Sequence, residues 1–265
     1  DSESDPYLFK NVHHQKIPHL QYSPVNPNMI FSCSYDGSIR CGDLENRVFS
    51  EVYVDKYSSC SYFDFLSPVS LIVGKKSGCI DVVDFRNGKS SAKSHECHGH
   101  LIETVSIHPI NKHYFITAMH RTVSVWDLRK LQRKPVASIT HPKNTTISAY
   151  FSPVTGNSIL TTFCDHSLCL FDSSYLTVKL WLKTTVRHGN FTGQATWLPE
   201  TDDVFMIGSE AQPGRIQILN DNMKNIYNFM DEDLSATAVN RFHPSKSVLA
   251  GSNPNGKVFV FVDSQ

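Results

Sequence analysis

The residues with the most evident chemical potential form a short run of metal-ligand types at 95–100, His-Glu-Cys-His-Gly-His. A structural zinc site needs four ligands, which usually come as two pairs at defined spacings. No second pair stands out in the sequence, and the seven cysteines are scattered without a Cys-x-x-Cys pair. We therefore predict no metal and no cofactor, and we interpret the cysteines as reduced thiols of a cytosolic or nuclear protein.

A second candidate, Gly-Ser-Asn-Pro-Asn-Gly-Lys-Val at 251–258, nearly matches a phosphate-binding loop. It fails because Val258 stands where a magnesium-binding Ser or Thr is needed, and because a strand pattern follows where a helix should begin. Ser, His and Asp do recur at regular offsets, but several partial copies favour a repeated hydrogen-bond network over one catalytic triad. The sequence predicts a protein that is not an enzyme.

The elements that carry these residues repeat along the chain. Each repeat has an apolar alternating run ending in Pro, then a short strand, a turn and a second strand ending in Asp or Asn. Successive prolines of this pattern are 41 to 46 residues apart, and one copy ends in the dipeptide Trp126-Asp127. This period and this dipeptide are typical of WD-repeat β-propeller blades. The repeats lie near 13–43, 57–84, 98–127, 141–172, 187–220 and 233–263.

The predicted fold is all-β, a WD40 β-propeller with six visible repeats, each a sheet of four antiparallel strands. We expect inner strands at 29–34, 114–118, 204–208 and 258–262, since these runs are short, rich in β-branched or aromatic residues and bounded by turn residues. A polar lead at 1–6 precedes a single propeller domain at 7–265. Either a strand at 7–12 closes a six-bladed ring against the last repeat, or the chain lacks an N-terminal blade.

Composition narrows the function classes. The 265 residues hold 25 Lys+Arg against 25 Asp+Glu and are 40% hydrophobic, which argues against a wholly basic nucleic-acid coat and against a disordered chain. No run approaches the roughly 18 apolar residues of a membrane helix, and the acidic start does not fit a secretory signal. We expect a folded protein without a membrane partner.

Charged residues gather in the loops that share one propeller face, which we call the top face. These loops enter the inner strands or join the two middle strands of a blade. In the first five repeats their basic residues outnumber the acidic ones, so this face could contact phosphates, although solvated loop charge explains it equally well. Tyr57 and Phe191 in the same loops could stack on a base or line a peptide pocket.

The opposite face carries two related motifs, Asp-Phe-Arg at 84–86 and Trp-Asp-Leu-Arg at 126–129. Each places an Arg two residues beyond a strand-ending Asp. Arg is favoured at the centres of interfaces because its planar guanidinium satisfies several acceptors while its stem covers apolar surface. These positions predict a protein-docking surface.

Four strings go beyond the general repeat pattern: SYDGSIRCGDLENRVFSEVY at 34–53, HPINKHYFITA at 108–118, ISAYFSPVTGN at 147–157 and RHGNFTG at 187–193. Through them the chain, from about residue 8 to residue 262, resembles WD-repeat proteins that serve in the nucleus as substrate receptors of cullin-4 ubiquitin ligases and contact damaged or modified DNA. The resemblance implies a nuclear, chromatin-associated protein whose partners are the cullin-4 ligase adaptor and DNA or chromatin proteins.

The resemblance implies seven blades, so we expect a seven-bladed propeller that lacks an N-terminal blade. It also implies roles for individual residues: Arg86 and Arg129 match adaptor-docking arginines, and Arg187, His188, Asn190, Phe191 and Arg215 match loops that face DNA. With the Trp-Asp-Leu-Arg motif, the predicted adaptor-docking set is Arg86, Trp126, Asp127 and Arg129. With the charged and aromatic residues of the top-face loops, the predicted DNA-binding set is Lys16, Tyr57, Lys75, Lys76, Arg121, Lys143, Arg187, His188, Asn190, Phe191 and Arg215. One departure is that Gly193 is followed at once by Gln194-Ala195, where the relatives carry a longer basic and aromatic stretch. We find no projecting loop with apolar wedge residues, so kinking of a duplex is not expected.

Two functions remain open at this point. The first is a non-enzymatic ligase receptor that binds DNA or chromatin. The alternative is a general WD40 scaffold that binds peptides and has no nucleic-acid role.

Overall fold

A computed structural model describes residues 12–86, 91–131, 134–165, 167–174, 178–183, 193–209, 214–231, 234, 239–253 and 255–262. The chain divides into two compact units, 1–101 and 102–265, and each is described by itself. The single domain expected over 7–265 stays a prediction. Residues 7–11 of the expected strand at 7–12 lie outside the described residues.

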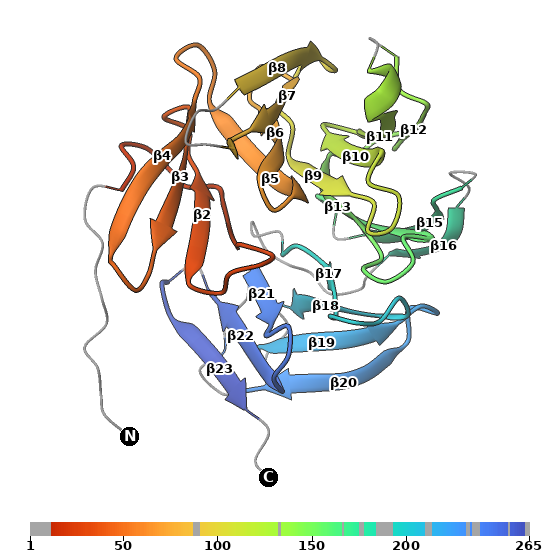
Figure 1. Ribbon diagram of the computed structural model, residues 1–265. Coiled ribbons are helices and arrows are strands. Elements are labelled where there is room, and N and C mark those ends of the chain that lie inside the picture. The colour runs from red at the N-terminus through yellow and green to blue at the C-terminus, as the bar shows by residue number, and fades with distance from the viewer. Residues whose placement is uncertain are drawn as a thin grey trace. The chain divides into compact units, whose positions relative to one another are not determined.

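Unit 1 contains two four-stranded antiparallel sheets, which we call blades 1 and 2 (Figure 1). Blade 1 is formed by β1 (His19–Tyr22), β2 (Met29–Cys33), β3 (Ser38–Asp43) and β4 (Val48–Val54). Blade 2 is formed by β5 (Cys60–Ser67), β6 (Ser70–Lys75), β7 (Cys79–Asp84) and β8 (Ser91–Glu96). The two sheets share one apolar core, in which the rings of Phe31 and Phe65 meet edge to face at 5.0 Å.

Unit 2 contains blades 3 to 6 (Figure 1). Blade 3 is formed by β9 (Thr104–Ile107), β10 (Tyr114–Met119), β11 (Thr122–Asp127) and β12 (Ala137–Thr140), with a short 3-10 helix, η2 (Leu128–Lys130), after β11. Blade 4 is formed by β13 (Thr146–Phe151), β14 (Ser158–Phe163), β15 (Ser167–Asp172) and β16 (Val178–Lys183). Blade 5 is formed by β17 (Thr196–Trp197), β18 (Val204–Ser209), β19 (Arg215–Asn220) and β20 (Asn225–Met230). Blade 6 is formed in the described residues by β21 (Val239–Phe242), β22 (Val248–Ser252) and β23 (Val258–Val262).

In blades 1, 2, 3 and 5 the two middle strands are more buried than the fourth strand, because a propeller blade packs both of its faces against neighbours. In blade 3, β10 pairs with β11 so that Phe115 lies opposite Trp126. The indole of Trp126 is 1% exposed, and its Nε1 donates to Thr117 Oγ1 at 2.8 Å. A buried indole N–H needs an acceptor, so this bond fixes the end of β11.

The prediction of an all-β WD-type propeller fold with six blades is confirmed. The four expected inner strands match β2, β10, β18 and β23 to within one residue at each end. Whether the propeller carries a seventh blade stays a prediction. In the described residues, no helix combines the length and apolarity that a membrane crossing requires.

Candidate binding surfaces

A hydrogen-bonded network ties the loop before β1 to the turn between β2 and β3. The ring of His13 contacts Asp36 Oδ2 through Nδ1 at 3.1 Å and Ser32 Oγ through Nε2 at 2.7 Å. Its side chain is 1% exposed, and burial lowers its pKa in spite of the neighbouring carboxylate. Ser38 Oγ donates to Asp36 Oδ1 at 2.6 Å. The Ser, His and Asp seen in the sequence thus form a structural network in this blade.

The pKa of Asp36 is well below its usual range. Burial would raise it, but hydrogen bonds from Ser38, from the backbone N–H of His14 and from His13 outweigh that cost. The carboxylate is therefore ionised, and it lies inside the network with only 11% of its side chain exposed.

Lys75 overturns one expectation. Predicted as a top-face residue facing DNA, it ends β6 and is only 5% exposed, with Nζ 2.8 Å from both Asp55 Oδ2 and Asp81 Oδ1. Tyr53 donates its hydroxyl to the other oxygen of Asp81. Burial alone would lower the pKa of Lys75, but hydrogen bonds to Asp55 and Asp81 raise it. The charge of Lys75 is used inside blade 2, so it is not a surface contact for phosphate.

Lys16 and Lys76 are exposed, as expected of top-face residues. Their ammonium groups lie over the same ring, that of Tyr35 in the β2–β3 turn, at 5.9 Å and 5.6 Å from its centroid. Tyr57 is 99% exposed. The structure therefore brings together three of the predicted residues around Tyr35 and the neighbouring loop, all in unit 1. Sequence reasoning missed Tyr35, because a lone Tyr in a turn carries no signal of the two lysines above it.

The remaining top-face residues belong to unit 2. Arg121 is half-buried, and its Nη1 donates to the carbonyl of Pro142 at 2.9 Å. Lys143 is exposed, and Arg215 is half-buried at the start of β19. The other predicted residues of this face, Arg187, His188, Asn190 and Phe191, lie outside the described residues.

The two predicted docking arginines have the same local geometry. Arg86 binds Asp84 through Nε at 3.2 Å and Nη2 at 2.8 Å. Arg129 binds Asp127 through Nε at 3.0 Å and Nη2 at 2.7 Å. In both cases the Arg backbone N–H also donates to the same carboxylate. The Arg86 and Arg129 side chains remain 68% and 54% exposed, so each blade presents a positioned guanidinium.

Further interactions hold the Arg129 side chain in place. Its guanidinium lies 5.8 Å from the Tyr114 ring centroid, and its hydrogen bonds lower the pKa of Asp127 to about 2. Trp126 and Asp127 were also predicted as docking residues, but both are buried. Trp126 anchors the end of β11 through its hydrogen bond to Thr117, and Asp127 holds the guanidinium of Arg129 in place. Of the residues of this motif that were predicted to dock, Arg129 is therefore the one with an exposed side chain.

The run at 95–100 is partly buried, and burial raises the pKa of Cys97 to about 12 and lowers the pKa of His98 to about 4. Within the described part of the chain, no three His, Cys, Asp or Glu side chains converge as a metal site would require.

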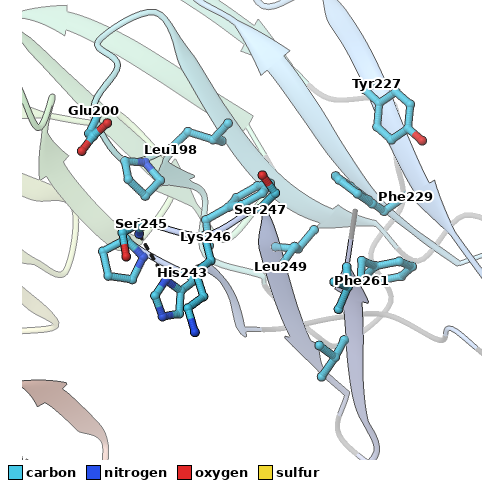
Figure 2. Close-up of a pocket in the computed structure, with 15 residues that line it drawn as sticks. Leu198, Glu200, Tyr227, Phe229, His243, Ser245, Lys246, Ser247, Leu249 and Phe261 are labelled. Carbon is cyan, nitrogen blue, oxygen red and sulfur yellow. Dashed lines mark hydrogen bonds between the residues drawn. The ribbon is translucent and has the colours of Figure 1, made fainter. Parts of the chain in front are cut away.

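A cavity of about 870 Å³ lies between blades 5 and 6 of unit 2 (Figure 2). Phe229, Leu249 and Phe261 from neighbouring strands form its apolar wall. His243 and Lys246 of the loop between β21 and β22 add polar groups. The sequence did not single it out, because the alternating aromatics of β20 and β23 have the pattern of an ordinary core strand.

Comparison with known proteins gives consistent results. No family model matches the chain. WD repeat-containing protein 76 of Mus musculus is 40% identical over 276 residues, which cover 100% of this chain and 44% of that protein. The Xenopus laevis protein of the same name is 38% identical, covering 97% of this chain and 46% of its own length. The DNA damage-binding protein cmr1 of Neurospora crassa is 26% identical, with 97% and 55% covered.

The resemblance to WD-repeat proteins seen in the four sequence strings is thus confirmed, as a similarity to WD repeat-containing protein 76 over nearly the full chain. The chain spans about half the length of the curated relatives that it matches.

Proposed function

We propose that this chain is the propeller of a DNA-damage-related WD-repeat adaptor, without enzymatic activity, that docks on a cullin-4 ubiquitin ligase adaptor and binds DNA or chromatin. Relatives named for WD repeats and for DNA-damage binding support the general role. A nuclear location would follow from it.

The observation that carries the ligase proposal is the matched pair of Asp–Arg forks at Asp84–Arg86 and Asp127–Arg129. A free arginine loses rotamer freedom when it docks, and this loss opposes binding. Here two hydrogen bonds to one carboxylate already restrict each side chain, while more than half of its surface stays accessible. A partner can therefore bind each of these guanidinium groups at a reduced entropic cost.

The test is charge reversal at both forks. In the Arg86→Glu, Arg129→Glu double variant we expect capture by the purified cullin-4 adaptor to be lost, because each Glu removes a cation and places repulsive charge beside an Asp. Surface substitutions of this kind change stability by only about 0.5 kcal/mol, so the melting temperature should stay close to wild type.

The matched control is the Lys130→Glu, Lys134→Glu double variant, which reverses two exposed charges near Arg129 without touching either fork. Capture of this control should persist. Undiminished capture of the arginine variant by the adaptor would show that the forks are not the docking site.

The second candidate function, a scaffold that grips peptides without nucleic acid, is favoured by the cavity between blades 5 and 6. Its apolar wall and the nearby Lys246 suit an amphipathic peptide. Partner capture from nuclear extract, with and without nuclease, separates the candidates: partners held through DNA are lost after nuclease, while direct peptide partners remain.

A further inference from the structure

Four loops of unit 1 are joined by backbone hydrogen bonds around Tyr35. The loop before β1 meets the β2–β3 turn where the Tyr35 N–H donates to the Lys16 carbonyl at 3.0 Å. The same turn meets the β4–β5 loop where the Asp55 N–H donates to the Gly37 carbonyl at 2.8 Å. The β6–β7 turn joins them through the Lys76 N–H and the Ser59 carbonyl at 2.9 Å. The side chains on these loops are thus held by a connected backbone frame.

Gly37 makes this close approach possible. Its φ is +86°, a conformation that glycine adopts readily. A Cβ at this position would lie 2.1 Å from the Asp55 carbonyl oxygen. The β2–β3 turn and the β4–β5 loop can therefore touch only because residue 37 has no side chain.

The exposed charges on this frame are cationic. The carboxylates of Asp36 and Asp55 are recessed, with 11% and 14% of their side chains exposed, and they bind His13, Ser38 and Lys75 within the frame. Lys16 and Lys76 are exposed, and neither forms an ion pair with any residue that the structure describes. Both sit near the Tyr35 ring, whose negative face attracts them and offsets part of their mutual repulsion. An anionic ligand would complete the neutralisation.

Tyr57 is carried by the β4–β5 loop, which is joined through Asp55 and Ser59 to the same backbone frame. Its backbone N–H donates to Asp55 Oδ1 at 2.8 Å, and Asp55 in turn is anchored by Lys75. The backbone is therefore fixed while the ring is 99% exposed. An aromatic ring held in water on a fixed loop gains no packing energy in the free protein, but it is preorganised to stack on a flat ligand.

We propose that Lys16, Lys76 and Tyr57 form a binding site for single-stranded nucleic acid, in which the two lysines contact backbone phosphates and Tyr57 stacks on an unpaired base. This assignment rests on the proposed DNA role and adds its substrate class. Exposed aromatic rings recognise unpaired bases, whose faces are open, whereas base pairs in a duplex keep theirs stacked. The combination of phosphate contacts and one stacking ring therefore favours a strand without a partner.

The test is fluorescence anisotropy with labelled oligothymidylate of about 12 nucleotides, a length within the range of one compact site. A duplex of equal length provides the comparison, and both are measured over a salt series. We expect wild type to bind the single strand more tightly than the duplex. The Lys16→Gln, Lys76→Gln variant should weaken single-strand binding about tenfold at low salt and reduce the slope of log K against log salt by about 1.4, since each lost phosphate contact contributes about 0.7.

Tyr57→Ser should also weaken single-strand binding about tenfold, while Tyr57→Phe should retain it, since one stacked base contributes about a factor of ten or more. The control is the Lys112→Gln, Lys224→Gln variant, which removes two exposed lysines from other loops and should bind as wild type. All these positions are exposed, so unchanged melting temperatures should accompany the results.

The outcomes separate this inference from the proposed function. DNA binding by wild type that neither the lysine variant nor Tyr57→Ser weakens would overturn the site and leave the DNA role to other loops. A Tyr57→Ser protein with unaltered single-strand affinity would overturn the stacking assignment. If wild type binds neither probe at low salt, the DNA part of the proposed function falls together with this inference.

Discussion

In blades 1 and 2 a polar contact, which we call a tie, links the loop before the first strand to the turn between the two middle strands. The two blades place the acidic and the basic partner of this tie on opposite sides. In blade 1 the base, His13, lies on the loop, and the acid, Asp36, lies in the turn. In blade 2 the acid, Asp55, lies on the loop, and the base, Lys75, lies at the turn. The two blades thus make the same loop-to-turn connection with the acidic and basic partners exchanged. The geometry of the blade requires a polar tie between loop and turn, but it leaves the chemical identity of the two partners open.

The difference has an energetic consequence. The blade 1 tie joins a neutral imidazole to a single ionised carboxylate, that of Asp36, whose charge is stabilised by hydrogen bonds. The blade 2 tie encloses one ammonium and two carboxylates, and Tyr53 satisfies part of the excess negative charge at Asp81. Removing one member of a buried ion network leaves an uncompensated charge, whereas removing a neutral hydrogen-bond partner costs less. A substitution in the blade 2 tie should therefore lower the free energy of unfolding more than one in the blade 1 tie.

The strongest test of this comparison is Lys75→Met, which keeps the length of the side chain and removes its charge. Asp55 and Asp81 would be left without their cation, and we expect the free energy of unfolding to fall by about 3 to 5 kcal/mol. Urea denaturation followed by circular dichroism measures it. The neighbouring variant Lys76→Met, at an exposed position, should change stability by less than about 0.5 kcal/mol. Equal effects at 75 and 76 would contradict the buried network.

A smaller effect is expected in blade 1. Asp36→Ala removes the acceptor of His13 and of the His14 N–H, and should lower the free energy of unfolding by about 1 to 3 kcal/mol in the same urea experiment. The control is Glu51→Ala on the exposed face of β4. A loss that equals or exceeds that of Lys75→Met would reverse the ranking of the two ties.

Much of the fold could be predicted from the sequence, because the Pro and Asp positions recur at the blade period. The runs before these prolines also alternate between apolar and other residues, as β-strands do. The pattern also placed His13 at the network offset and Arg86 and Arg129 beyond their strand-ending acids. It could not tell Lys75 from Lys76. In a strand, adjacent side chains point to opposite faces, and the strand boundary between these two lysines decides which of them is enclosed. Nor could it place Lys16 over Tyr35, since that contact depends on two turns meeting at Gly37.

The smallest expected effect is the pH dependence of the free energy of unfolding. The contributions of the two ties to it have opposite signs. The folded-state pKa of His13 is lowered from 6.5, so the unfolded chain binds the proton more readily. The contribution of His13 is therefore complete above about pH 6.5 and declines as the pH falls below that value. Lys75 has a raised pKa, so its contribution is complete below 10.5 and is lost only as the pH rises through the folded-state value.

Unfolding free energies measured from pH 7.5 to pH 5.5 should thus fall more steeply in wild type than in a His13→Gln variant, whose tie does not titrate. Lys75 contributes nothing to the wild-type slope over this range, since its pKa is raised and lies far above it. An unaltered slope in His13→Gln would contradict the lowered pKa of His13. A wild type that instead gains stability relative to His13→Gln as the pH falls would mean that the pKa is raised and that the protonated imidazole is bound to Asp36 as an ion pair. Blade 1 would then share the ionic chemistry of blade 2, and only the placement of the charges would separate the two.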